Sequence, residues 1–178
     1  MVYLRRLVWF IGRNLIWLCV ILGVLVCGFY MCLNTANIYV ILTDGLEKRV
    51  DAILTREDAE KLGMYFHADF LSNDDALEGA FDGTSVYTAY NITGYDYDLK
   101  IEKLWAWPWD QYATCTVVER VSNIKGTVKS DAQGASATIP SWQGGRYDIT
   151  VVRQDGQWKI NGMQQTAVLM EAATGEGA

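Results

Sequence analysis

His67 is the only histidine of this 178-residue chain, and Asp69 follows it by two positions. An imidazole is the side chain best suited to move protons near neutral pH, and a nearby carboxylate assists it only if the chain bends between the two. Positions i and i+2 of a helix do not face each other. We therefore predict no catalytic dyad, and we keep His67 and Asp69 as candidates for a pocket or a partner surface.

Tryptophan supplies the other unusual chemistry of this chain. Trp105, Trp107 and Trp109 alternate within the sequence WAWPWD, and Trp142 lies further along. Alternate residues of a strand share one face, so Trp105 and Trp107 are expected to lie together. Packing of these two rings in the core is the simpler interpretation, with Trp109 past the turn. The alternative is an aromatic surface for a hydrophobic peptide or a glycan ring, because tryptophan buries a large area and is enriched in binding hot spots.

Metal and cofactor motifs are not found in the sequence. Structural zinc needs about four ligands in close pairs, whereas Cys19, Cys27 and Cys32 lie in one apolar stretch and only Cys115 lies beyond it. The aspartates at 74–75 lack the alternating ligands of a calcium loop and are better placed to cap a helix. No phosphate-binding glycine loop or nucleophile motif occurs. The sequence predicts no metal, no cofactor and no enzyme, and a lone Cys115 allows no disulfide in the part that follows the apolar stretch.

That apolar stretch, residues 15–33, contains no Asp, Glu, Lys, Arg, His, Asn or Gln. At about 1.5 Å per residue it is about 28 Å long, close to the roughly 30 Å hydrocarbon core of a bilayer, so it predicts a transmembrane helix. Within it Cys19, Gly23 and Cys27 recur every four residues, which indicates a ridge where a second helix packs closely, or small residues that simply face lipid. Cleavage after the stretch is the alternative to an anchor, although 34–36 is a weak cleavage site.

Charge divides the chain at this stretch. Arg5, Arg6 and Arg13 precede it without any acid, and 12 Lys and Arg against 21 Asp and Glu follow it. Basic flanks stay in the cytoplasm, so we expect a cytoplasmic N-terminus at 1–14 and an extracytoplasmic C-terminal part. That part is too acidic to favour nucleic acid.

Periodicity beyond the span predicts one α+β domain at 44–170, after a juxtamembrane segment at 34–43 and before a flexible tail at 171–178. Helical spacing, with Asp44 and Glu47 as a capping pair, predicts a first helix after residue 44. A second helix is expected to carry Ala59, Leu62 and Phe66, and a third to cover 75–80. From residue 85 the period changes to two, which predicts strands at about 85–92, 97–107 and 112–121, a bend at 122–126, and a hairpin that turns at 155–156.

Three helices followed by long antiparallel strands, closing on the hairpin YDITVVRQDGQWKI, resemble the nuclear transport factor 2 like (cystatin-like) family. The resemblance covers about 44–165 and implies a curved sheet that wraps helices into a cone. Family members on single membrane helices include ectodomains of conjugation channels, domains of cell-wall transpeptidases and components of sporulation complexes. It therefore implies a scaffolding or assembly subunit of a bacterial envelope complex, with the membrane and proteins, including copies of itself, as partners. The alternative is a ligand-binding, isomerase or dehydratase domain that uses the cone as a pocket.

Overall fold

The chain forms one long helix and a four-stranded antiparallel sheet, in a computed structural model that describes residues 2–57, 59–130, 132 and 134–169. The predicted α+β class with an apolar N-terminal helix is confirmed. The tail predicted at 171–178 lies outside the described residues.

Helix α1 runs without interruption over Val2–Thr55. The helix start predicted at Asp44 is therefore wrong, because that residue lies inside α1. The reason is a buried stripe with a four-residue period that crosses the expected boundary: Ile38, Leu42, Leu46, Val50 and Leu54 are all buried. The juxtamembrane segment expected at 34–43 thus contributes Ile38 and Leu42 to the core. The helix ends at Thr55, and Arg56 directly after it has a left-handed φ of 65°.

Short helical segments follow α1. The second predicted helix is only a 3-10 segment, η1 (Ala59–Met64), and Phe66 lies beyond it, where it pairs with Ile160 as an isolated bridge. Helix α2 spans Ala68–Leu71, α3 spans Asp75–Asp82, and the 3-10 segment η2 spans Val86–Ala89. The third predicted helix is confirmed as α3, which Asp74 caps by accepting hydrogen bonds from the amides of Ala76 and Leu77.

The sheet is a meander in the order β1-β2-β3-β4, formed by Tyr90–Trp105, Tyr112–Val128, Gly145–Gln154 and Gln157–Val168. The predicted hairpin is confirmed, with Asp155 and Gly156 both at positive φ in its turn. Strand β2 continues through the bend expected at 122–126, but its pairing with β1 shifts register opposite Gly94 and Asn123 has a φ of 51°. The irregularity at 122–126 was predicted correctly, but the strand end predicted at residue 121 is wrong, because β2 continues to Val128.

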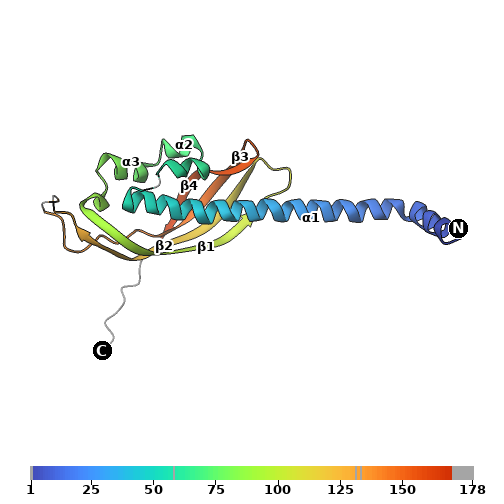
Figure 1. Cartoon of the computed structure of the whole chain (residues 1–178), viewed down its shortest axis with the longest axis horizontal. Helices are drawn as coiled ribbons and strands as arrows, with labels where there is room; N and C mark the ends of the chain where they lie inside the picture. The colour runs from blue at the N-terminus through green and yellow to red at the C-terminus, as the bar shows by residue number, and fades with distance from the viewer. Residues whose placement is uncertain (1, 58, 131, 133, 170–178) are drawn as a thin grey trace, which may run out of the picture.

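The core lies between the C-terminal half of α1 and one face of the sheet (Figure 1). The sheet contributes residues spaced by two, as the alternation predicts: Ala113, Cys115, Val117, Ile149, Val151, Trp158 and Ile160. Helix α3 packs against α1, and α2 packs against β4. The N-terminal half of α1 projects away from this domain, and none of its most apolar stretch is buried. It is long and apolar enough to cross a bilayer.

Candidate functional site

His67 and Asp69 approach each other at the start of α2. His67 precedes α2 with an extended backbone, so the chain bends, and its Nδ1 lies 3.5 Å from Oδ2 of Asp69. The expectation that their spacing keeps them apart, which assumed a helix, is therefore wrong. The same Nδ1 accepts a hydrogen bond from the Asp69 amide at 3.3 Å, so the imidazole caps α2. This geometry serves the local fold and leaves Asp69 largely exposed to solvent.

The four tryptophans singled out in the sequence occupy two separate places. Trp142 is partly buried and its ring stacks on Tyr87 with centroids 6.0 Å apart. Trp105, Trp107 and Trp109 instead lie exposed at the connection between β1 and β2. The core packing favoured for Trp105 and Trp107 is thus wrong, because β1 ends at Trp105 and the chain leaves the sheet there. Trp109 lies past the end of the strand, as predicted.

The small-residue ridge of the apolar stretch lies on α1, where Cys19 and Gly23 are exposed and Cys27 is half-buried. A methyl group added at Gly23 would meet no atom of this chain within 4 Å. Its role as a seam for a second helix stays a prediction. Among the described residues, no group of three or more His, Cys, Asp or Glu is placed to hold a metal ion.

A charged cluster that sequence reasoning missed lies in the core. Arg49 of α1 binds Asp74 through two hydrogen bonds of 2.6 and 2.9 Å, and Glu119 of β2 is fully buried nearby. The Tyr97 hydroxyl donates to Oε1 of Glu119 at 3.4 Å. The signal was present in the sequence: Glu119 continues the inward series of Cys115 and Val117, so alternation alone places a carboxyl in the core.

The electrostatics of this cluster follow from burial and pairing. Burial raises the pKa of the Glu119 carboxyl, and the Arg49 guanidinium offsets part of that rise. Burial by itself lowers the pKa of Arg49, but the hydrogen bonds and charge of Asp74, together with the charge of Glu119 and Tyr147, outweigh it, so the pKa of Arg49 is raised. Oε2 of Glu119 and Nε1 of Trp142 are both buried and lack a hydrogen bond of good geometry, although the indole helps to lower the pKa of the carboxyl. The cluster links α1, the cap of α3 and the sheet, and it is largely shielded from solvent.

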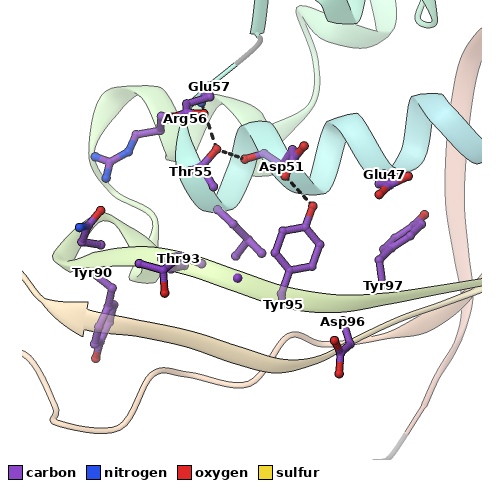
Figure 2. A pocket seen from close by; sticks show the side chains of 14 residues that line it. Glu47, Asp51, Thr55, Arg56, Glu57, Tyr90, Thr93, Tyr95, Asp96 and Tyr97 are labelled. Atoms are coloured by element: carbon purple, nitrogen blue, oxygen red, sulfur yellow. Dashed lines mark hydrogen bonds between the residues drawn. The ribbon is translucent and has the colours of Figure 1, made fainter.

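An open groove of about 690 Å³ runs between the end of α1 and the first half of β1. Its acidic lining residues are Glu47, Asp51, Glu57 and Asp96. Figure 2 shows Tyr95 and Tyr97 pointing from β1 toward Asp51 and Glu47 of α1. The Tyr95 hydroxyl donates to Oδ1 of Asp51 at 2.6 Å, and burial together with this carboxylate raises the pKa of Tyr95.

The groove is suited to binding a cation-rich or polar segment. Carboxylates at its edge attract positive charge, and the two tyrosines offer flat apolar rings with polar tips. None of the residues singled out in the sequence as pocket candidates lines it. Tyr97 was predicted only as a strand residue and Tyr95 fell between two predicted strands, because the sequence does not reveal that α1 lies over them.

Comparisons of the chain with protein-family models, with curated proteins and with solved structures found no match. The resemblance to the nuclear transport factor 2 like family therefore stays a prediction that rests on element order and on the terminal hairpin.

Proposed function

We propose that this chain is a non-enzymatic, single-pass membrane protein whose C-terminal domain is an extracytoplasmic scaffolding or assembly subunit of a bacterial envelope complex. Such a complex would act in sporulation, in conjugation or secretion, or in cell-wall synthesis. The finer fold assignment, a nuclear transport factor 2 like cone, belongs to the same proposal. The charge difference across the apolar stretch supports the orientation, with arginines inside and the acidic domain outside.

The observation that carries the proposal is the continuity of α1. One helix contains the apolar stretch and also supplies the buried stripe from Ile38 to Leu54 around which the domain is built. A domain whose core helix is also its anchor is held at a fixed place over the bilayer. That arrangement suits a subunit that must present a surface to neighbours in the same membrane.

The groove between α1 and β1 is the surface we assign to a protein partner. It is open, four carboxylates line it against the single cation Arg56 among the described residues, and it lies along β1, which is the end strand of the sheet. A partner segment carrying lysine or arginine gains favourable charge contacts there, which sets the approach and the orientation of binding.

Site-specific photo-crosslinking in cells tests this assignment. A photoreactive residue at Thr93, which is exposed and lines the groove, should capture a defined partner. The same probe at Lys100, exposed on the other face of β1, is the matched control. Glu47→Lys should abolish capture at Thr93 without unfolding the domain, because Glu47 is exposed. Equal capture from both positions, or capture that survives Glu47→Lys, would reject the groove as the partner site.

Substitution of His67 separates a scaffold from an enzyme. His67→Gln should leave complex assembly and cell phenotype unchanged, because the imidazole only caps α2 and glutamine keeps a hydrogen-bond acceptor. Loss of function with an unchanged melting temperature would instead assign an acid or base to this position.

A further inference from the structure

The three exposed tryptophans form one continuous aromatic surface, which we call the tryptophan loop (residues 105–109). The rings of Trp105 and Trp107 meet edge to face at 5.3 Å, and those of Trp107 and Trp109 stack at 5.3 Å with planes 10° apart. Their residues are 50%, 41% and 65% exposed. A contiguous exposed aromatic patch of this kind is typical of a protein, membrane or ligand interaction site.

Two anchors fix the backbone of this loop. Ala106 between the first two indoles is fully buried, and the Trp107 amide donates to Oδ2 of Asp110 at 2.9 Å. The indoles are therefore held outward by a defined turn, and their exposure does not come from a frayed strand end.

The position of the loop along α1 identifies what it faces. The Asn34 side chain donates from Nδ2 to the carbonyl oxygen of Trp107 at 3.1 Å. Asn34 is the first residue after the apolar stretch 15–33, and it is buried, whereas Leu33 just before it is exposed. Figure 1 shows the β1–β2 connection at the end of the domain from which the N-terminal half of α1 projects.

The loop and the predicted membrane surface therefore lie at the same height. The headgroup region on each side of a bilayer is about 5 to 8 Å thick. With the hydrocarbon boundary at residue 33, the backbone of Trp107, bonded to the next residue of α1, lies within that layer. Tryptophan is enriched there, because its ring is amphipathic.

We propose that the tryptophan loop inserts into the headgroup region of the outer leaflet of the same bilayer that α1 crosses. It is a second membrane contact beside the span, and its ligand is the phospholipid interface. The inference rests on the proposed membrane anchoring. A protein or a glycan on these rings would have to fit between the domain and the bilayer, so lipid is the occupant that the position favours.

The test is fluorescence quenching of the full chain in phosphatidylcholine and phosphatidylglycerol nanodiscs whose lipids carry a nitroxide near the headgroup or deep in the acyl chain. The chain is compared with a variant carrying Trp105→Ser, Trp107→Ser and Trp109→Ser, and the difference between the two signals belongs to the loop. We expect headgroup nitroxide to quench the loop signal more than deep nitroxide does. Trp109→Ser alone, at the most exposed of the three residues, should remove part of this signal and covers the case in which the triple variant misfolds.

Trp17 in the span keeps the two proposals distinguishable. It is present in every variant together with Trp9, and lipid nitroxide quenches these two residues only if α1 is inserted. If the triple variant shows no lipid quenching at all, the anchoring itself fails. If its Trp17 is quenched while the loop signal of the full chain is unaffected by lipid nitroxide and open to aqueous iodide, the loop faces water and the inference is overturned. A loop signal protected from both quenchers would assign the rings to a protein or glycan and would equally overturn it.

Discussion

Arg49 and Asp74 form a bidentate ion pair between the C-terminal half of α1 and the N-cap of α3, with N–O distances of 2.6 and 2.9 Å. Both side chains are almost inaccessible to solvent. The C-terminal half of α1 is thus joined to the domain by charge as well as by its apolar stripe, and it belongs to the folded unit.

A soluble version that begins at residue 34 should consequently be more stable than one that begins at residue 43. The shorter version lacks Ile38 and Leu42, both fully buried. Burying such a side chain contributes about 1.5 to 3 kcal/mol, so the loss should be about 3 to 6 kcal/mol of the roughly 5 to 15 kcal/mol typical of a domain. Urea unfolding followed by circular dichroism measures it, and equal midpoints would show that the domain begins after Leu42.

Arg49→Met should lower the free energy of unfolding by about 3 to 5 kcal/mol, because it leaves the buried Asp74 carboxylate without its partner. Lys48→Met is the neighbouring control. Its pair with Asp51 is 3.2 Å long and about one-third exposed, so the loss should be about 0 to 1 kcal/mol. Adding Asp74→Asn to Arg49→Met should restore part of the stability, since asparagine still caps α3. Equal losses at residues 48 and 49 would contradict the burial argument.

Stability should decline with rising pH through the titration of Glu119. Its pKa is raised by burial in the folded state, so its contribution is full below the ordinary carboxyl pKa and is lost as pH rises through the folded value. The groups that interact with Glu119 are Arg49, Asp74, Tyr97, Tyr147 and Trp142. The positive charge of Arg49 limits the rise in the pKa of Glu119. Comparing Glu119→Gln with the unaltered domain between about pH 4 and 8 isolates the effect, with a slope of at most about 1.4 kcal/mol per pH unit. Parallel curves would mean that folding leaves the pKa of Glu119 unchanged.

Two tryptophan substitutions should differ sharply in cost. Trp158 is buried in the core, and Trp158→Ala should destabilise the domain by about 3 to 5 kcal/mol. Trp109 is mostly exposed, and Trp109→Ala should change stability by about 0.5 kcal/mol or less in the soluble version. Thermal melts of both variants measure the two changes in stability. A large loss of stability in Trp109→Ala would show that the Trp109 ring supports the fold.

The proposed orientation predicts which part of the chain an external protease reaches. Protease added to wall-stripped cells should digest residues 34–178 and spare the N-terminus. Replacing Arg5, Arg6 and Arg13 by Glu should reduce this accessibility, because basic residues beside a span hold it in the cytoplasm. A domain protected in intact cells and digested after lysis would reverse the orientation.

Sequence periodicity located most of the strands and the face of each that is buried, because alternation of apolar residues is a local property. Alternation correctly placed Trp158 and Ile160 together on the inward face of β4, and it located the turn at Asp155. The continuity of α1 was missed for a related reason. Asp44 and Glu47 fit a helix start locally, and only packing of Ile38 against the sheet shows that the helix is already under way.

The candidate sites depend on contacts between distant segments, which no local pattern reveals. The groove exists because α1 lies beside β1, and the Arg49 pair spans 25 residues. The tryptophans were recognised as unusual, but their outward position follows from the end of β1 and from Asn34, 73 residues earlier.

The unbroken α1 also has a mechanical consequence. Between the apolar stretch and the core there is no hinge, and residues 34–55 extend about 33 Å at about 1.5 Å per residue. A tilt or axial rotation of the span is therefore transmitted directly to the domain. A force that acts on the domain is likewise transmitted directly to the span. The far end of the molecule, where α3 and the groove lie, moves as the tip of a lever whose fulcrum is the bilayer surface.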